Sequence, residues 1–377
     1  MPGVEIVPVT DKRLLSRFIR LPERLHATDP AYIAPLHMER AEALNPGKNP
    51  LFGHAEAQYW LAVREGRDVG RISAQIDRLA LKLRPDEPGL FGLLAAEDDA
   101  EVFTALLDTA ADWLRVRGMK AMRGPFSLNI NEETGLLVDG FSAPPMLMMP
   151  HDLPYVAGQV EKRGLVKVKD VLAYLYDIRV ELPDAVRRLL ARELPPGLKV
   201  RRLDLKRIKE EIRNVTAIFN DAWSQNWGFV PLTEAETDYL AKALKPLLHP
   251  RLTSLVERDG EPVAFMIALP NLNEAIKGLK GRLLPFGWVR LLWRLKVAGV
   301  KTARVPLMGV RRAAARDMIG GLLPYLMIDQ VRREGLAMGY THIELSWILE
   351  DNLPMRRMIE GLRAAPYKTY RVYEKPI

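Results

Sequence analysis

The sequence contains no cysteine. This absence excludes disulfides, thiolate metal sites and a cysteine nucleophile, so the chemistry of any active site must use other side chains. The six histidines show no metal-ligand spacing, and we predict no metal. These residues are His26, His37, His54, His151, His249 and His342. The chain also lacks a G-x-S-x-G elbow and a P-loop, the signatures of common hydrolases and of nucleotide-phosphate binding.

Long hydrophobic runs are missing as well. No stretch reaches about 18 uncharged apolar residues, so we expect no membrane-spanning helix. The N-terminus, MPGVEIVPVTDKR, lacks the basic and apolar regions of a signal peptide. The chain has 377 residues, 48% apolar and 27% charged, which is typical of a globular protein with two domains. We expect a cytoplasmic protein that is soluble or peripheral at the inner membrane.

Acidic residues are absent from one long segment. From Ala275 to Arg316 there are eleven Lys or Arg and no Asp or Glu. Because the net charge of the whole chain is +8, the remainder carries about 8 − 11 = −3. The protein therefore has one basic region, which faces either an anionic partner or solvent.

The order of elements repeats along the chain. Residues 59–77 and 252–270 each read as a β-hairpin with a Gly-containing turn, and Asp259-Gly260 is a strong hairpin signal. Each hairpin is followed by a helix, a glycine stop and another strand; the stops are Gly118 and Gly339. We predict two equivalent α/β halves, residues 1–182 and 198–377, joined by a proline-bearing linker.

The last 75 residues carry the most specific pattern. A strand at 302–310 leads into a basic loop, Arg311–Gly321, and then a helix from about Leu322 to Ala337. Such a loop before a helix can bind an anion through backbone N–H groups. A strand at 341–348, an Asn-bearing turn, a short helix and a closing strand at 367–375 complete the chain.

This arrangement resembles the acyl-CoA-binding half of the GNAT superfamily of N-acyltransferases. The whole chain is similar to a tandem-GNAT bacterial family, on segments such as RLPERLHATDPAYIAPL, KNPLFGHAEAQYWLAV, GPFSLNINEETGLLVDGF, FNDAWSQNWGFVPLT and ILEDNLPMRRMIE. The resemblance implies an α/β fold of two tandem GNAT-like domains. Each is a mixed, mainly antiparallel twisted sheet flanked by helices.

The resemblance implies acyl-CoA as co-substrate, with the thioester on the strand Val305–Val310 and the pyrophosphate on the loop that follows. The residues it assigns to acyl-CoA are Met308, Val310, Arg311, Arg312, Arg316, Gly320, Gly321 and Asn352. Two positions depart from the family pattern. Ile319 stands where the loop usually has its first glycine, and Ile359 stands where a general-acid tyrosine is usual.

Candidates for proton transfer lie near the C-terminus. His342, Glu344 and Ser346 share one face of their strand, since side chains alternate with period two. Glu344, with His342, is a candidate general base; the alternative is that Glu344 pairs structurally with a basic residue. Tyr373, on the closing strand, is a candidate general acid, and Tyr367 and Tyr370 on the same segment are alternatives.

The acceptor is expected to contact both halves. The first half reads GLLAAEDDAEV between Gly92 and Val102, which would repel pyrophosphate, so we assign it a structural or acceptor-binding role. In the second half, Trp223, Asn226 and Trp227 form a candidate recognition loop. The alternative is that both tryptophans are core residues.

Residues 277–300 interrupt the second half. Trp288, Leu291, Leu292 and Leu295 fall on one helical face, and Arg290 and Arg294 share another. With Trp293, this pattern favours a helix lying in an anionic bilayer interface; the alternative is a helix packed on the protein with solvated charges. The Trp/Leu face argues against nucleic acid as the partner.

Some members of the neighbourhood resemble bacterial ceramide synthases, which acylate a sphingoid amine. We therefore expect an acyl-CoA-dependent N-acyltransferase acting on a lipid amine. One alternative is an N-acetyltransferase acting on a small amine or a protein. The other is a non-catalytic acyl-CoA- or lipid-binding protein on a GNAT scaffold.

Overall fold

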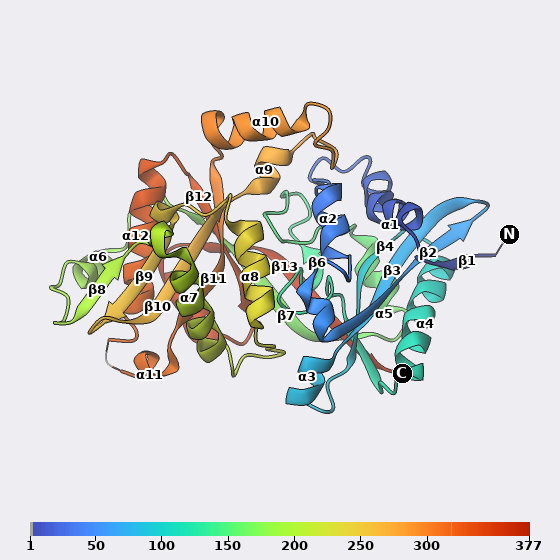
Figure 1. Cartoon of the computed structure of the whole chain (residues 1–377), viewed down its shortest axis with the longest axis horizontal. Coiled ribbons are helices and arrows are strands. Elements are labelled where there is room, and N and C mark those ends of the chain that lie inside the picture. The colour runs from blue at the N-terminus through green and yellow to red at the C-terminus, as the bar shows by residue number, and fades with distance from the viewer. Residues whose placement is uncertain (1–2, 318) are drawn as a thin grey trace. The chain divides into compact units, whose positions relative to one another are not determined.

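A computed structural model describes residues 3–317 and 319–377 (Figure 1). The chain folds into two compact units. The N-terminal unit comprises residues 1–172, 275–293 and 367–377, and the C-terminal unit comprises residues 173–274 and 294–366. Both are mixed α/β folds, as the sequence predicts. The division into folding domains at residues 182 and 198 stays a prediction, because compactness alone does not establish independent folding.

The sheet of the N-terminal unit follows the order β1-β2-β3-β4-β5-β13, and β6 also pairs with β13. It is antiparallel except where β4 runs parallel to β5. The strands are β1 (Glu5–Pro8), β2 (Ala55–Arg64), β3 (Arg67–Asp77), β4 (Gly89–Ala96), β5 (Ala121–Gly124), β6 (Leu136–Asp139) and β13 (Ala365–Pro376), with β7 (Val166–Asp177) entering the C-terminal unit.

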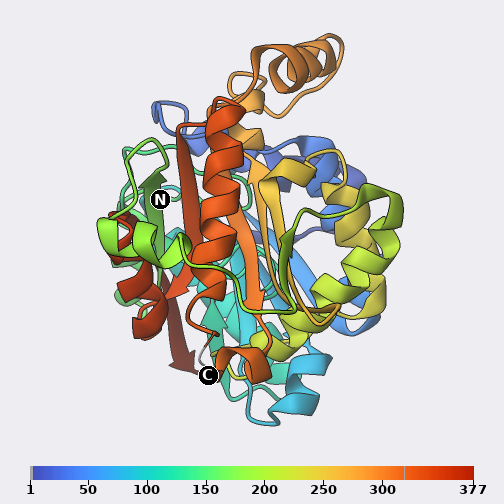
Figure 2. The ribbon, with the colours of Figure 1, turned by 90° about the vertical axis from the view of Figure 1, so that its left-hand side faces the viewer.

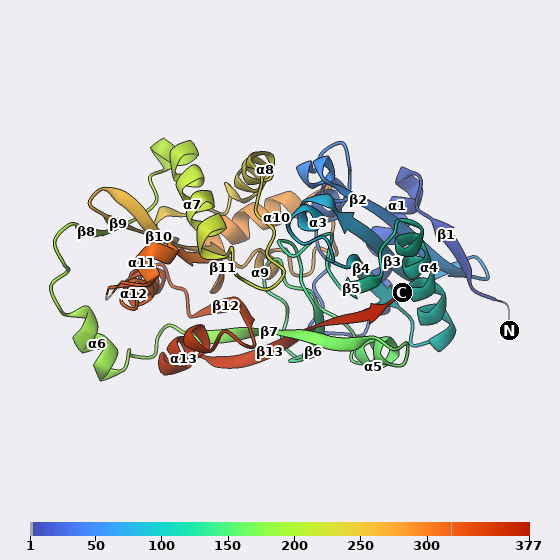
Figure 3. The same cartoon turned by 90° about the horizontal axis from the view of Figure 1, so that it is seen from below.

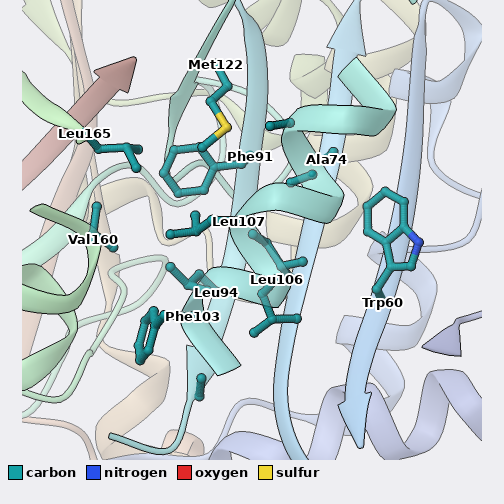
Figure 4. Close-up of a cluster of buried hydrophobic side chains, with 14 of the residues drawn as sticks. Trp60, Ala74, Phe91, Leu94, Phe103, Leu106, Leu107, Met122, Val160 and Leu165 are labelled. Atoms are coloured by element: carbon teal, nitrogen blue, oxygen red, sulfur yellow. The ribbon is translucent and has the colours of Figure 1, made fainter. Parts of the chain in front are cut away.

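Helices cover both faces of this sheet. They are α1 (Lys12–Leu25), α2 (His37–Ala43), α3 (Arg78–Leu83), α4 (Ala100–Val116) and α5 (Tyr155–Glu161), with a short 3-10 turn at Pro50–Gly53. Trp60 packs in one core with residues of α4, such as Leu106 (Figure 4). Tyr59 and Leu61 pack in a second core with residues of α1, because successive strand residues face opposite sides. The alternation of β2 thus creates two cores.

The sheet of the C-terminal unit follows the order β7-β12-β11-β10-β9-β8. Its strands are β8 (Leu198–Arg201), β9 (Thr253–Arg258), β10 (Glu261–Pro270), β11 (Thr302–Val310) and β12 (His342–Leu349). Its helices are α6 (Asp184–Leu190), α7 (Ile208–Ala222), α8 (Glu234–Leu244), α11 (Arg312–Ala315), α12 (Leu323–Ala337) and α13 (Leu353–Gly361), with 3-10 turns at Leu205–Arg207 and Pro250–Leu252.

Two helices sandwich this sheet. α12 runs along one face (Figure 2), and α7 lies on the opposite face (Figure 3). Gly309 permits the close packing of α7, because a Cβ there would lie 2.9 Å from the Phe265 ring and 3.3 Å from the Ala222 side chain. On the other face Gln330 of α12 accepts a hydrogen bond from Ser254 of β9 at 2.8 Å.

Both predicted hairpins are confirmed. Arg64 pairs with Arg67, and Arg258 pairs with Glu261, which leaves two-residue loops. Both residues of each loop have positive φ, including 51° at Glu65 and 52° at Asp259. Two consecutive positive φ values define the turn type whose twist matches that of the paired strands. Glycine takes the second position of each loop because it adopts a positive φ without strain.

The closing strand β13 was predicted as the end of the second half. Residues 367–377 group instead with the N-terminal unit, where Tyr373 pairs with Gly124 of β5 and Tyr370 pairs with Leu137 of β6. Tyr370, Val372 and Tyr373 are fully buried. The end of the chain is therefore part of the N-terminal sheet.

Candidate active site

The C-terminal unit contains a pair of parallel strands that diverge. β11 and β12 pair over four residues, from Thr302–His342 to Val305–Leu345. Both strands continue beyond this point, but no further pairing between them occurs among the described residues. Pro306 begins the separated part of β11 and cannot donate a ladder hydrogen bond. Because β11 stays paired with β10 as far as Val310, only its β12-facing edge is left open.

A buried ion pair lies where the strands separate. The Arg304 Nε atom lies 3.2 Å from Glu344 Oε1, and both side chains are almost completely inaccessible to water. Ser346 Oγ donates to the same oxygen at 2.6 Å and accepts from Arg304 Nε at 2.9 Å. This is the structural ion pair that the sequence left open as the alternative for Glu344; its role as a base stays a prediction.

The other two catalytic candidates lie elsewhere. His342 begins β12, at the paired end away from the divergence, with its Nε2 atom 3.8 Å from Asp177 Oδ2. Tyr373 belongs to the N-terminal unit, and its hydroxyl donates to Glu161 at 2.9 Å. Burial, and then the bond to Glu161, raises the pKa of Tyr373 above its usual value. The structure thus groups Glu344 with Ser346, and the assignment of Tyr373 as the general acid stays a prediction.

The basic loop follows β11 directly. Arg311 Nε donates to the Pro262 carbonyl at 2.9 Å, and the backbone amide of Arg312 donates to Asp221 Oδ2 at 2.7 Å. Arg316 is exposed and has no ion pair within the described part of the chain. One protein carboxylate therefore already caps one amide of the loop. The motif residue Met318 lies outside the described residues.

The loop and the start of α12 contain further backbone amides. Within residues 3–317 and 319–377, no hydrogen bond is found for the amides of Ala313, Gly321 or Leu323, which precede or open α12. Gly320 is sterically required, because an added Cβ would lie 2.5 Å from the Ala315 carbonyl oxygen and 2.6 Å from that of Ala314. These features suit an anion at the start of α12.

Asn352 has a clear local role. Its side chain caps α13 by accepting a hydrogen bond from the Met355 amide at 3.3 Å. Such caps commonly stabilise a helix by about 1 kcal/mol. The assignment of Asn352 to acyl-CoA stays a prediction.

The predicted recognition loop contacts β11. Trp223 ends α7, and its indole N–H donates to the Met308 carbonyl at 2.9 Å. The Asn226 amide donates to the Trp223 carbonyl at 2.8 Å, which folds the loop into a turn. Trp223, Asn226 and Trp227 are all half-buried. The structure therefore brings Trp223 beside the strand assigned to the thioester.

The predicted amphipathic insertion forms α10 (Gly287–Trp293) and a π-helical segment at Arg294–Ala298, after the short α9 (Leu272–Ile276). Large apolar side chains on it are exposed, including Phe286 at 77% and Trp293 at 56%. The others are Leu284, Trp288, Val289, Leu292 and Val297. The insertion is anchored within the N-terminal unit by a hydrogen bond from the His37 amide to the Gly281 carbonyl at 3.0 Å.

No family model matches the chain. A protein named bacterial ceramide synthase, from Caulobacter vibrioides (strain NA1000 / CB15N), is 50% identical over 377 residues, covering 99% of this chain and 98% of that protein. The chain belongs to the bacterial ceramide synthase family. Protein YghO of Escherichia coli (strain K12) is 43% identical over 368 residues, covering 97% of this chain and 94% of that protein.

Solved structures support the fold of this bacterial ceramide synthase family member. A tandem GNAT protein from the clavulanic acid biosynthesis pathway has a TM-score of 0.59 at 15% identity, covering 99% of this chain and 98% of that chain. A GCN5-related N-acetyltransferase from Sphaerobacter thermophilus has a TM-score of 0.56 at 12% identity, covering 99% and 95%. The predicted tandem GNAT fold is confirmed, and the family makes the protein an N-acyltransferase.

The N-terminal unit of this family member contains a polar cluster that the sequence reasoning missed. His26, Asp29 and His151 present ligand-type atoms within 4.8 Å of one another. Asp29 and His151 are 122 positions apart, so no short motif contains them. The nearest signal in the sequence is the i,i+3 spacing of His26 and Asp29.

Proposed function

We propose that the protein transfers a fatty acyl group from acyl-CoA to a lipid amine such as a sphingoid base. The observation that carries the proposal is the divergence of β11 and β12 next to a basic loop, in a chain whose relative is named a ceramide synthase. A thioester laid between the separated strands would meet backbone N–H groups that have no ladder partner. The same strand then leads into the loop that would hold the pyrophosphate.

The donor would be held mainly by backbone groups and arginines. The amides at the start of α12 and the side chains of Arg311, Arg312 and Arg316 supply the positive potential that a diphosphate requires. An N–H group of Met308 or Val310 would polarise the thioester carbonyl and stabilise the oxyanion. Gly320 would let the loop fold closely enough for its amides to converge.

The chemistry needs few protein groups. The deprotonated amine nitrogen attacks the thioester carbon, a C–N bond forms, and the C–S bond breaks as the electron pair leaves with sulfur. The nitrogen loses its second proton, and the CoA thiolate takes one up. Because a thiolate is a tolerable leaving group near neutral pH, the isoleucine at position 359 is compatible with this reaction.

The lipid nature of the acceptor is supported by the insertion. An exposed Trp/Phe/Leu surface next to Arg and Lys residues matches a helix that lies in an anionic headgroup layer. No helix within residues 3–317 and 319–377 has the length and apolar content to cross a bilayer. We propose, from the insertion, that the protein acts at the cytoplasmic face of the inner membrane as a peripheral protein.

The direct test is turnover. The purified protein is incubated with palmitoyl-CoA or acetyl-CoA and with sphinganine, a polyamine or no amine, while free thiol and N-acyl product are measured. We expect thiol release with sphinganine, in equal amount to an N-acyl product found by mass spectrometry. Turnover only with acetyl-CoA and the polyamine would indicate an N-acetyltransferase acting on a small amine instead of a lipid amine. Binding of palmitoyl-CoA without turnover would indicate a non-catalytic protein.

A further inference from the structure

The backbone groups of β11 face its two sides alternately. The Arg311 amide donates at 2.8 Å to the carbonyl of Val263, the residue opposite it in the register of β10 and β11. In an antiparallel ladder such hydrogen-bonded residues alternate with residues whose N–H and C=O groups point the other way. Gly309 therefore faces β10, whereas Met308 and Val310 turn their N–H and C=O groups to the opposite edge. Among the described residues, β12 does not pair with that part of the edge.

The end of α7, which packs beside β11, engages one of these edge groups (Figure 3). The Trp223 indole N–H donates to the Met308 carbonyl at 2.9 Å. The indole ring also packs against Phe219 of the same helix, with ring centroids 5.0 Å apart. Trp223 and Met308 are both half-buried, so solvent reaches this contact. The indole thus occupies a strand-edge acceptor of the kind that an extended ligand uses when it adds to a sheet through its own amide N–H.

The same end of α7 engages the basic loop. Asp221 Oδ2 accepts the backbone N–H of Arg312 at 2.7 Å, and Arg312 Nη1 donates to Ser224 Oγ at 3.4 Å. All three residues are half-buried. A carboxylate that accepts a backbone N–H makes the same charge-assisted hydrogen bond as a phosphate oxygen. Asp221 therefore occupies part of the loop that we assign to the diphosphate.

These two contacts match the two kinds of polar group in CoA. Asp221 lies in the last turn of α7 and Trp223 is its C-cap, and both belong to the C-terminal unit together with β11 and the loop. CoA carries amide groups in its pantetheine arm and a diphosphate at the end of that arm. It therefore presents an N–H donor and phosphate oxygens in one molecule. The side chains of Trp223 and Asp221 present the same two chemistries to the same two backbone groups.

We propose that residues 221–224 form a latch on the donor site, which must release the Met308 carbonyl and the Arg312 amide before acyl-CoA can use them. This inference rests on the proposed function for the identity of the donor. Release requires only the rotation of side chains at a helix end, because both contacts are made by side-chain atoms of α7. The observed affinity for the donor is then the intrinsic affinity multiplied by the fraction of molecules in which the latch is open.

The sign of a mutational effect separates this latch from a structural role. If the contacts of Trp223 and Asp221 only hold β11 and the loop in the geometry that binds the donor, removing them weakens CoA binding. If the contacts compete with the donor, removing them increases the open fraction and tightens CoA binding. CoA itself is the probe, since it contains the amide arm and the diphosphate without an insoluble acyl chain.

The indole contact is tested by calorimetry with CoA on the Trp223→Phe protein. This change removes the N–H donor and keeps an aromatic ring beside Phe219. We expect CoA to bind about two- to tenfold more tightly, which is the factor that corresponds to one neutral hydrogen bond. The matched control is Trp113→Phe, which changes a half-buried tryptophan of α4 in the N-terminal unit and should bind CoA as the wild type does.

The carboxylate contact is tested with Asp221→Asn, which we expect to bind CoA about tenfold more tightly because it removes a charge that competes with the diphosphate. Asp204→Asn is the control. Asp204 accepts the Lys206 amide at 2.9 Å in the same unit, so this variant has the same change in charge at another capped amide. ADP has a diphosphate but no amide arm. Asp221→Asn should therefore tighten ADP binding, and Trp223→Phe should leave it unchanged.

The outcomes distinguish the latch from the proposed function. Equal or weaker CoA binding by Trp223→Phe and Asp221→Asn proteins with wild-type thermal midpoints would overturn the latch and leave the donor site in place. Equal tightening by Asp204→Asn would also overturn it, because net charge would then govern the affinity. A wild type that binds CoA but forms no N-acyl product would reject the proposed function, whereas tighter CoA binding by the two variants would still support the latch.

Discussion

Glu344 illustrates how the surroundings of a residue determine its role. A carboxylate beside a histidine on an apolar strand reads as a candidate base in the sequence. In the structure its Oε1 atom lies 3.2 Å from Arg304 Nε and accepts a hydrogen bond from Ser346. Breaking a buried pair by removing one charge usually costs about 3–5 kcal/mol, because the partner stays buried and uncompensated.

We therefore expect Glu344→Gln to lower the free energy of unfolding by about 3 kcal/mol, measured by urea denaturation with tryptophan fluorescence. The double variant Glu344→Leu with Arg304→Met is the control, since it removes both charges and is expected to lose less stability than the single change. A Glu344→Gln protein with wild-type stability and no turnover would instead support the base role.

Arg316 is the residue that tests the anion site most directly. It is exposed and free of ion pairs within residues 3–317 and 319–377, so a charge reversal changes electrostatics without breaking a contact. Arg316→Glu is expected to weaken palmitoyl-CoA binding by about tenfold or more in calorimetry, since hydrogen bonds to charged groups are worth about 1.5–3 kcal/mol.

The matched control is Arg192→Glu, an exposed arginine of the same unit outside the loop. It carries the same change in net charge and should leave binding within about twofold of wild type, by analogy with surface substitutions away from a site. Equal weakening by both variants would mean that net charge, rather than the loop, governs binding.

At the scale of elements, α10 and its flanking residues expose large apolar side chains to solvent. Phe286 and Trp293 are 77% and 56% exposed, and the segment around them carries no acidic residue. An exposed apolar patch bordered by cationic residues is more often an interaction surface than an ordinary solvated helix face. The sequence predicts an amphipathic helix from periodicity and leaves open whether its apolar face meets a bilayer or packs on the protein. The structure adds that this face is exposed and that α10 groups with the N-terminal unit.

Removing this surface should reduce membrane binding. Phe286→Ser with Trp293→Ser is expected to lower the fraction that floats with phosphatidylglycerol-containing liposomes, by about a hundredfold or more in partition coefficient, because each aromatic side chain inserted into the bilayer contributes about 1.5–3 kcal/mol. Val116→Ser, which changes an 84% exposed apolar residue of α4, is the matched control. Flotation that is equal for all three proteins would contradict the assignment of α10 to the bilayer.

At the scale of the whole molecule, the closing strand connects distant parts of the sequence. β13 pairs with β5 and β6 and buries Tyr370, Val372 and Tyr373 within the N-terminal unit. We expect a fragment of residues 1–182 to lack a stable fold alone and to gain protection of its β5 amides when a peptide of residues 365–377 is added. Hydrogen exchange with mass spectrometry measures this protection.

A fragment of residues 1–182 that is protected and monomeric without the peptide would support the predicted domain division instead. A scrambled peptide of the same composition is the control, because it retains the charge and hydrophobicity of the strand without its pairing pattern. Protection by the scrambled peptide would show that non-specific association, rather than strand pairing, stabilises the fragment.

Local features followed from the residues alone. The turns at Glu65-Gly66 and Asp259-Gly260, the helix stop at Gly339 and the strand Thr302–Val310 are set by interactions within a few positions, which a sequence records directly. The family resemblance added the tandem arrangement. For these parts of the fold and site, the hydrophobic periodicity, the helix-capping residues and the turn residues all predict the same structure.

The remaining features depend on long-range packing. The divergence of β11 from β12, the burial of Arg304 against Glu344, the pairing of β13 and the meeting of His26 and Asp29 with His151 join positions far apart in the chain. No local periodicity encodes such partners, because each results from which surfaces bury one another after the elements form. The sequence therefore showed which ionisable residues the chain contains. It did not show which of them are buried together in one place.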